Sequence, residues 1–284
     1  MSTITQRHRD TYDAVGAVRV DGVFSEAWVD SFTRVVDDLI SRVRAGTIPS
    51  LVPPHPVYQP IVFEEHDGYV RMISTLPHAP RLSELLLASL APKIVADTIG
   101  ADSLRLWVDG TFLKEGNAAG TATPWHNDQC TYSLIGEHVP SLWIALTDVD
   151  EDNSPLTTLA GSHRDAWRYH SPFSPQDVPT PTGFKPWQHL LDRVRAPDAD
   201  IRVWPVKRGD AIVLHPKVIH GSLPRHASSA GRRIGFSVRW IGDDVVWAPN
   251  VLNQLAPFDR NPLMQAGKPP PEVIFPVIWR RGAT

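Results

Sequence analysis

Cysteine is nearly absent from this chain, whose 284 residues include only Cys130. A single thiol can form no disulfide within the chain and no zinc site built on cysteine ligands. Long apolar runs are absent as well, since no window approaches the roughly eighteen residues of a membrane-spanning helix. The opening residues, MSTITQRHRD, are polar and do not resemble a secretory signal. We therefore expect a cytoplasmic protein that does not bind membranes.

A strong net charge is also missing. Lysine and arginine number 28, and aspartate and glutamate number 31, which leaves a formal net charge of −3. This near balance argues against nucleic acid as a partner. Glycine-rich phosphate loops, the zinc-protease motif H-E-x-x-H and the hydrolase motif G-x-S-x-G do not occur. Their absence argues against nucleotide binding, Rossmann chemistry, zinc proteolysis and α/β-hydrolase activity.

Proline, by contrast, is abundant, and its 27 residues favour a fold of short strands and many loops. Apolar residues make up 42% of the chain, enough for a sizeable core. From residue 104 onward, short β-rich segments alternate with turn residues. The predicted strands are 104–114, 122–131, 142–149, 156–159, 201–205, 211–214, 218–222 and 234–241. Strands without intervening helices predict an antiparallel sandwich or barrel.

The N-terminal part carries the helical patterns. A strand at 17–20 precedes a helix at 27–43, which begins behind the N-cap residue Ser25 and has apolar residues at helical spacing. A second helical stretch covers 80–99, and we expect Pro92 to kink or split it.

Proline-rich segments complete the organisation. The run 48–60 is typical of a loop, and 172–187 holds five prolines in sixteen residues, so we interpret it as an irregular excursion or lid. No compositional break marks a linker. We therefore expect one domain over 1–284, with its β core at about 104–244 and its N-terminal helices at about 25–99.

One pattern with metal-binding chemistry remains, a histidine two residues before an aspartate. It begins at His8, His126 and His163, so it is not specific by itself. Only His126 lies in a β-like segment, where residues i and i+2 point to the same face. His126 and Asp128 would then offer an imidazole and a carboxylate together, two of the three ligands of a facial triad. His163 is expected to hydrogen-bond a loop instead.

The third ligand of such a triad is a second histidine. The β-like segments after residue 128 contain His215, His220 and His226. His220 is the best placed, because it follows two apolar strand residues and precedes a turn, whereas His215 is interpreted as structural. Arg233 opens the next strand. A hairpin would bring its planar guanidinium beside the metal, where it suits bidentate capture of a carboxylate.

Four motifs in sequence order resemble the phytanoyl-CoA dioxygenase (PhyH) family of Fe(II)/2-oxoglutarate oxygenases. They are WHND, SLWIALTDVDEDNSPLTTLAGSH, KRGDAIVLHPKVIHGS and RRIGFSVRWIGDD, between about Thr111 and Asp244. The resemblance implies a mainly β fold with flanking helices, the double-stranded β-helix or cupin-like jelly roll. It implies Fe(II), 2-oxoglutarate as cosubstrate and O2. By the same resemblance, His126, Asp128 and His220 match the catalytic iron ligands.

The resemblance also assigns cosubstrate positions. Arg233 matches the arginine that binds the distal carboxylate of 2-oxoglutarate, and the adjacent Arg232 stays open as its rival. Trp143 and Lys114 occupy positions that face the cosubstrate, although an exposed lysine is the simpler interpretation of Lys114. Related halogenases carry a small residue where this chain has Asp128, so oxygenation is favoured over halogenation.

The implied activity is that of a non-haem iron dioxygenase. Such an enzyme hydroxylates or otherwise oxidises a small organic molecule and releases succinate and CO2. The near-neutral charge and the many aromatic residues favour a modest, partly apolar substrate, such as a secondary-metabolite intermediate. A free small molecule is favoured over a CoA thioester, since no concentrated basic patch is present for the phosphates of CoA. Two alternatives stay open: an inactive jelly-roll protein with a binding or regulatory role, and an iron oxygenase that does not use 2-oxoglutarate. A monomer and a homo-oligomer are equally compatible with the sequence.

Several aromatic residues have two interpretations, as the lining of a substrate pocket or as core packing. They are Trp125, Tyr132, Trp167, Trp187 and Trp247. Cys130 is expected to be a small buried residue rather than a functional thiol.

Overall fold

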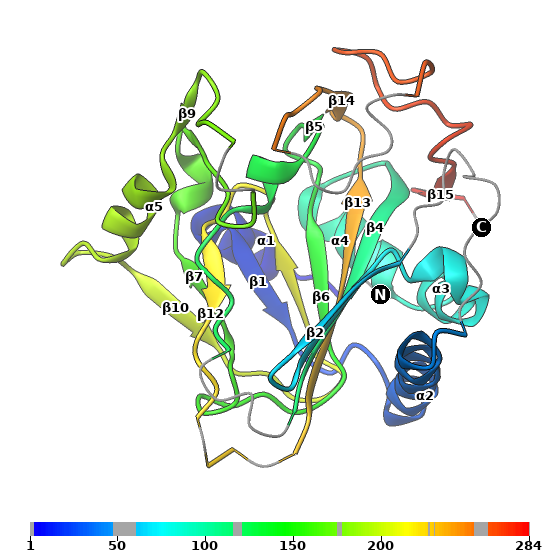
Figure 1. Cartoon of the computed structure of the whole chain (residues 1–284). Helices are drawn as coiled ribbons and strands as arrows, with labels where there is room; N and C mark the ends of the chain where they lie inside the picture. The colour runs from blue at the N-terminus through cyan, green and yellow to red at the C-terminus, as the bar shows by residue number, and fades with distance from the viewer. Residues whose placement is uncertain are drawn as a thin grey trace.

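The computed structural model describes residues 3–47, 61–115, 121–174, 178–226, 228–229, 231–252 and 261–283. Two antiparallel sheets form its centre (Figure 1). The larger sheet contains β1 (Ala17–Val20), β2 (Val62–His66), β3 (Tyr69–Ile73), β4 (Ser103–Lys114), β6 (Ser141–Ala145), β11 (Ala211–Leu214), β13 (Arg233–Ile241) and β15 (Val277–Arg280). The smaller sheet contains β7 (Leu156–Leu159), β10 (Ile201–Trp204) and β12 (His220–Ser222). The predicted loop at 48–60 lies outside the described residues.

The order of the strands is that of a double-stranded β-helix. The larger sheet runs β1-β11-β6-β13-β4-β3-β2, with β15 paired to β4, and the smaller sheet runs β10-β7-β12. Figure 1 shows the smaller sheet on the left, the larger sheet in the centre and helices α2 (Glu26–Arg44) and α3 (Pro80–Leu87) on the right. The predicted mainly β jelly roll with flanking helices is confirmed. Four strands of the larger sheet come from outside 104–244.

Strand β13 separates the core from the site by simple alternation. Its even-numbered residues, such as Phe236 and Val238, join the hydrophobic core on the helical side of the sheet. Its odd-numbered residues face the other way, and Arg233, Ser237 and Arg239 line a cavity between the sheets. Because successive side chains of a strand point to opposite faces, one nine-residue strand serves both purposes.

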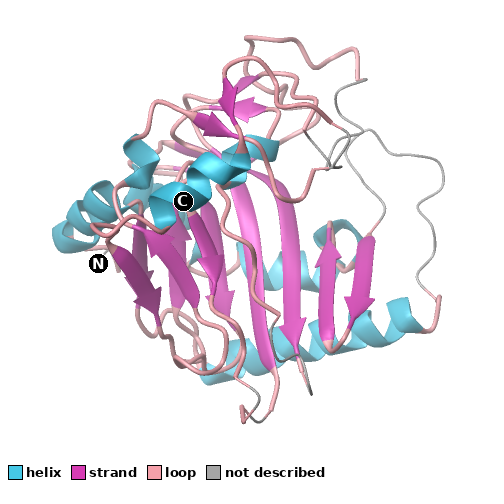
Figure 2. Ribbon diagram, turned by 60° about the vertical axis from the view of Figure 1, so that its left-hand side comes forward, coloured by secondary structure: helices cyan, strands magenta, loops and turns pink. Residues whose placement is uncertain are grey.

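Helices α2 and α3 cover the outer face of the larger sheet (Figure 1). Helix α2 begins at Ser25, whose hydroxyl accepts a hydrogen bond from the amide of Trp28, and its apolar stripe is buried. The ring of Phe32 meets that of Phe236 on β13, edge to face, with 4.9 Å between the centroids. In Figure 2 the strands run side by side and the helices lie around them. The predicted helix at 27–43 is confirmed.

The second predicted helical stretch is divided in two. Helix α3 ends at Leu87, and α4 (Ala91–Ile99) begins with Pro92 in its first turn. Proline is tolerated there because the first amides of a helix have no partner within the helix. Of the two outcomes expected at Pro92, the split is therefore the correct one.

Other elements differ from the sequence prediction. The polar opening forms α1 (Gln6–Val15), capped by Thr5, and 187–194 forms α5 (Trp187–Val194). The stretch 122–131 is not a strand: it makes one bridge at His126 and then the short helix η2 (Asp128–Thr131). Its β-branched and aromatic residues resemble a strand locally, but Asn127 begins a helical turn by accepting a hydrogen bond from the amide of Cys130.

The remaining elements are short and lie within the connecting loops. They are η1 (Leu76–His78), β5 (Leu134–Ile135), η3 (Ser162–Arg164), β8 (Arg168–Tyr169), β9 (Phe184–Lys185) and β14 (Val246–Trp247). Within 172–187 the described residues form little regular structure beyond β9. Among the described helices, none is both long and apolar enough to cross a membrane.

Gly235 tests the packing between β13 and β6. A Cβ built at Gly235 would lie 2.2 Å from an atom of the Trp143 ring, closer than packed atoms approach. We predict that Gly235→Ala lowers the free energy of unfolding by about 1–3 kcal/mol, measured by urea denaturation. Ser237→Ala, two residues further on the same face, is the control and should cost less. A Gly235→Ala protein as stable as the unaltered one contradicts this packing.

Candidate metal and cosubstrate site

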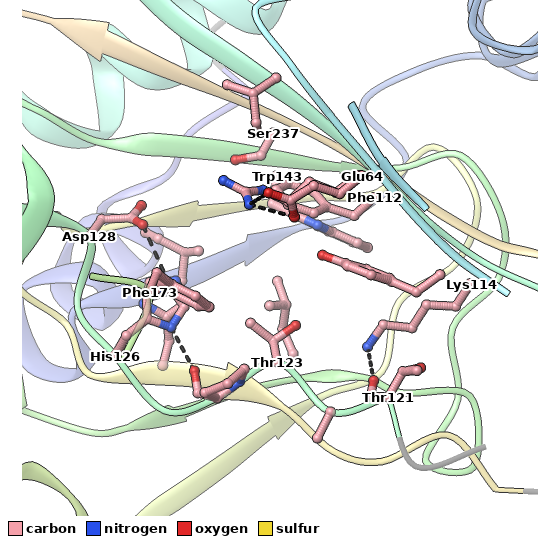
Figure 3. A pocket seen from close by; sticks show the side chains of 18 of the residues that line it. Glu64, Phe112, Lys114, Thr121, Thr123, His126, Asp128, Trp143, Phe173 and Ser237 are labelled. Atoms are coloured by element: carbon pink, nitrogen blue, oxygen red, sulfur yellow. Dashed lines mark hydrogen bonds and ion pairs between the residues drawn. The ribbon is translucent and has the colours of Figure 1, made fainter. Parts of the chain in front are cut away.

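A cavity of about 530 Å³ lies between the two sheets. Both sheets and the loop before η2 contribute to its walls, which combine apolar and charged side chains. Its lining includes Tyr69, Phe112, Lys114, Trp143, His220 and Arg239. Figure 3 shows His126 and Asp128 at one end of the cavity and Lys114 at the other.

Two backbone hydrogen bonds bring the predicted histidine ligands together. The amide of His126 donates to the carbonyl of His220 over 2.8 Å, and the amide of His220 donates back over 2.7 Å. This isolated antiparallel bridge joins the loop at 126 to strand β12. The two imidazole centroids are 4.3 Å apart, and both residues are buried.

Asp128 reaches the same point from the first turn of η2. Its Oδ1 lies 3.7 Å from Nε2 of His126, and its Oδ2 accepts a hydrogen bond of 2.8 Å from Ser141 on β6. One ligand atom each from His126, Asp128 and His220 lies within 4.8 Å of the others. The sequence analysis predicted that strand alternation would bring His126 and Asp128 together. In the structure they are close because a β-bridge at His126 is followed by the helical turn of η2.

The donor set fits a divalent transition metal. Nδ1 of His126 lies 2.7 Å from the carbonyl of Pro124, and Nδ1 of His220 lies 3.0 Å from the carbonyl of Val218. A carbonyl can only accept, so each Nδ1 carries the proton and each Nε2 keeps its lone pair. Burial and the neighbouring His126 lower the pKa of His220 to about 4, so this imidazole is neutral at pH 7. Two imidazoles and one carboxylate are the ligands of non-haem Fe(II) sites.

Asp128 is ionised despite its burial. Burial by itself would raise its pKa, but Arg239 and the two histidines outweigh this effect and hold the pKa well below its usual range. Sequence reasoning missed Arg239. The alternation that runs through Arg233 and Ser237 continues to Arg239, and following it two residues further would have found this side chain.

Arg233 lies at the other end of the cavity. Its Nη2 donates to the carbonyl of Ser154 over 3.1 Å, and its guanidinium lies 4.9 Å from the centre of the Trp143 ring. Burial lowers its pKa to about 10, so it is still a cation at pH 7. Arg232 points outward, where it pairs with Asp37 and Glu115. Of the two candidate arginines, Arg233 alone lies among the cavity residues.

Lys114 is buried beside Arg233, with 1% of its surface exposed, so its interpretation as an exposed lysine is wrong. Strand pairing sets Lys114 directly opposite Arg233. Its Nζ lies within hydrogen-bonding distance of the carbonyl of Thr121 and the hydroxyls of Ser154 and Ser222. Burial, and then the nearby charge of Arg233, lowers its pKa to about 6. Its amine is therefore largely neutral at pH 7.

The rival histidines lie elsewhere. Nε2 of His163 contacts the carbonyl of Asp13 at the end of α1, and Nε2 of His215 contacts Glu137. Neither residue lines the cavity. Both are buried and hydrogen-bonded, but the partner of His163 lies in helix α1 and not in a loop.

The five aromatic residues considered as pocket lining also differ in position. Tyr132 lines the cavity, whereas Trp125, Trp187 and Trp247 pack in hydrophobic clusters and Trp167 is half exposed. Cys130 is buried, as expected, and burial raises the pKa of its thiol to about 12.

Comparison with known proteins agrees with this geometry. The family model described as "Phytanoyl-CoA dioxygenase (PhyH)" matches residues 12–234. The chain belongs to the phytanoyl-CoA dioxygenase family. This membership confirms the predicted family. The match includes the triad and Arg233 and ends just after them.

A curated relative belongs to the same family. "Phytanoyl-CoA dioxygenase domain-containing protein 1" from Danio rerio is 28% identical to the chain over 138 residues. The alignment covers 48% of this chain and 45% of the relative, so the chain spans about half the length of the curated relative it matches.

Solved structures share the fold of this PhyH protein. SnoK, a non-heme alpha-ketoglutarate-dependent carbocyclase from nogalamycin biosynthesis, aligns with a TM-score of 0.72 and 20% identity, over 98% of this chain and 99% of SnoK. The epimerase SnoN from the same biosynthesis gives 0.68 and 18%, over 97% and 96%. EctD from S. alaskensis, solved with 2-oxoglutarate and 5-hydroxyectoine, gives 0.64 and 17%, over 95% and 86%. At these identities the likeness establishes the jelly-roll fold.

His163 provides a test of the structural role assigned to it. Burial, with smaller contributions from His215 and Arg164, lowers its pKa from 6.5 to about 4. The unfolded chain therefore binds this proton at a higher pH than the folded protein, and stability is lost as the pH falls from about 6.5 to about 4.

We predict that His163→Gln reduces this acid sensitivity. Glutamine keeps a donor for the carbonyl of Asp13 but takes up no proton. Urea denaturation at pH 7 and pH 5 should show a smaller loss of unfolding free energy for the variant than for the unaltered protein. Equal losses in the two proteins would mean that His163 titrates alike in both states.

Proposed function

We propose that this protein is an Fe(II)- and 2-oxoglutarate-dependent dioxygenase that hydroxylates or otherwise oxidises a small organic molecule. One observation carries the proposal: buried ligand atoms of His126, Asp128 and His220 lie within 4.8 Å of one another, in the cavity that also holds Arg233. A metal site alone is common to many proteins. A metal triad together with a buried cation suited to a carboxylate matches a keto-acid cosubstrate.

Each residue has a role in this proposal. His126, Asp128 and His220 hold the iron, and the Arg233 guanidinium binds the distal carboxylate of 2-oxoglutarate. Bound iron and cosubstrate supply oxidative decarboxylation with O2, which yields succinate, CO2 and the oxidant that attacks the substrate. Trp143 stacks on Arg233 at 4.9 Å and keeps its guanidinium in the cavity wall. Lys114 donates hydrogen bonds at the same end.

The residues of the chain also protect the site from water. Phe173 packs its ring edge-on to His126, with 4.8 Å between the centroids, and Tyr132 lies in the same part of the wall. Excluding water prevents the oxidant from being wasted in side reactions. Apolar side chains of the cavity wall, such as Phe112 and Leu156, offer the substrate a surface to pack against.

Relatives of the same fold support a small-molecule substrate. SnoN has been solved in complex with Fe3+, alpha ketoglutarate and nogalamycin RO, and EctD with 2-oxoglutarate and 5-hydroxyectoine. A secondary-metabolite intermediate is our proposal for this chain as well, with hydroxylation as the default outcome. The cytoplasmic location stays a prediction.

The first experiment is anaerobic addition of Fe(II) and then 2-oxoglutarate to metal-free protein. We expect the visible charge-transfer band of a chelated keto acid, and we expect its loss in His126→Ala and His220→Ala because each variant removes a ligand. His163→Gln, which alters a buried histidine outside the cavity, is the control and should keep the band. Iron binding without a band would favour an oxygenase that does not use 2-oxoglutarate. No iron binding would favour an inactive binding protein.

The neighbouring arginines offer a matched pair of variants. Arg233→Ala should weaken 2-oxoglutarate binding by about tenfold to a hundredfold, because it removes charge-assisted hydrogen bonds worth about 1.5–3 kcal/mol. Arg232→Ala should leave the affinity unchanged, since its side chain pairs with Asp37 and Glu115 outside the cavity. Titration of the charge-transfer band measures both. A larger loss in Arg232→Ala than in Arg233→Ala would reverse the assignment.

A further inference from the structure

The two cavity arginines of β13 lie at opposite ends of the site. Arg233 is paired in the sheet with Lys114, and Arg239 is paired with Ser141, which holds the carboxylate of Asp128. Six residues of extended strand separate their Cα atoms by about 20 Å. Arg239 is therefore at the triad end, whereas Arg233 is at the end assigned to the distal carboxylate of 2-oxoglutarate.

Arg239 is held in position, but its terminal nitrogens remain available. Its Nε donates to the hydroxyl of Tyr132 over 3.0 Å. Nη2 lies 3.7 Å from Oδ1 of Asp128, which is longer than a hydrogen bond. Among the described contacts, neither Nη1 nor Nη2 donates a hydrogen bond to the protein. The side chain is 12% exposed and lines the cavity.

The charges of the cavity do not balance without a further anion. Its charged lining residues are Glu64, Arg71, Lys114, Asp128, Arg233 and Arg239. Glu64 and Arg71 neutralise each other, with both carboxylate oxygens 2.8 Å from Nη1 of Arg71. Doubly charged iron and doubly charged 2-oxoglutarate cancel. Asp128 then offsets one arginine, and one positive charge remains even when Lys114 is neutral.

When a metal is bound at the triad, the excess positive charge lies beside Arg239. Asp128 is the nearest anion to Arg239, but in the proposed site its charge is shared with the metal. Asp109 is a second carboxylate whose charge acts on Arg239. It is buried behind the sheet and accepts its hydrogen bonds from Thr75 and Leu76. Neither carboxylate accepts a hydrogen bond from the terminal nitrogens of Arg239, so a ligand that supplies an anionic acceptor from the cavity side is favoured there.

We infer that the substrate carries a carboxylate, which Arg239 binds beside the metal triad. This inference rests on the proposed function and names the substrate class of that same site. A guanidinium presents its donors in one plane, which matches a carboxylate. The Tyr132 ring and other apolar side chains of the cavity wall would hold the rest of the molecule. The carboxylate thus fixes which part of the substrate lies next to the metal.

The test compares acids with their amides, which have nearly the same shape but no charge. Phenylacetate and phenylacetamide, benzoate and benzamide, and hexanoate and hexanamide are titrated anaerobically into protein that holds Fe(II) and saturating 2-oxoglutarate. Calorimetry gives each dissociation constant. We expect the acid of at least one pair to bind about tenfold tighter than its amide, as a charge-assisted hydrogen bond provides. The inference is wrong if no acid of the panel is preferred.

Variants assign the preference to Arg239. Arg239→Gln should bring the ratio of acid to amide affinity close to one while the 2-oxoglutarate band persists, and Arg239→Lys, which keeps the charge, should retain part of the preference. Arg71→Gln is the matched control, since it removes the same single charge from a residue of the cavity lining that is already paired with Glu64, and its ratio should fall less than that of Arg239→Gln.

Other outcomes distinguish a failure of the inference about the substrate from a failure of the proposed function. Loss of the charge-transfer band in Arg239→Gln would show that Arg239 serves the metal or the cosubstrate. A preference for acids over amides that survives in this variant would place the anion site elsewhere. Either result overturns the inference about the substrate but not the proposed function. Absence of the band in the unaltered protein overturns the proposed function. The same acid and amide titrations in metal-free protein then still decide whether Arg239 binds a carboxylate.

Discussion

Two backbone hydrogen bonds between His126 and His220, of 2.8 and 2.7 Å, hold the candidate site together. They attach the loop at 126 to the smaller sheet. Because each bonded residue carries one of the imidazoles, the pairing of the backbone also pairs the rings. Asp128 follows in the first turn of η2 and meets Ser141 on the larger sheet. The three ligands thus connect both sheets, and opening either contact would separate the donor set.

The larger sheet links the core to the cavity through single strands. On β13, Phe236 packs against helix α2 while its neighbours on either side, Gly235 and Ser237, face the cavity side. A shift of one residue in register would exchange these two faces. It would place arginines in the hydrophobic core and aromatic rings in the cavity, so the burial of the core also determines the orientation of the site.

Buried charge is the main energetic cost of this arrangement, and the structure reduces it locally. Asp128 has Arg239 and Ser141 as neighbours, Arg233 stacks on Trp143, and Lys114 has a pKa of about 6, so its burial as a cation is avoided. The cations still outnumber the anions in the cavity. The site is therefore suited to ligands that bring negative charge, first the cosubstrate and, by our inference, the substrate.

From the sequence alone, strand and helix patterns predicted a mainly β fold with flanking helices, because periodicity is a local property of the chain. Four motifs that resemble the PhyH family pointed to His126, Asp128, His220 and Arg233 as candidate site residues. The sequence could not determine that 122–131 is a bridge and a helical turn, that Lys114 is buried, or that Arg239 lies beside Asp128. These depend on contacts between residues far apart in the chain, whose solvent exposure and neighbours exist only once the two sheets have packed together.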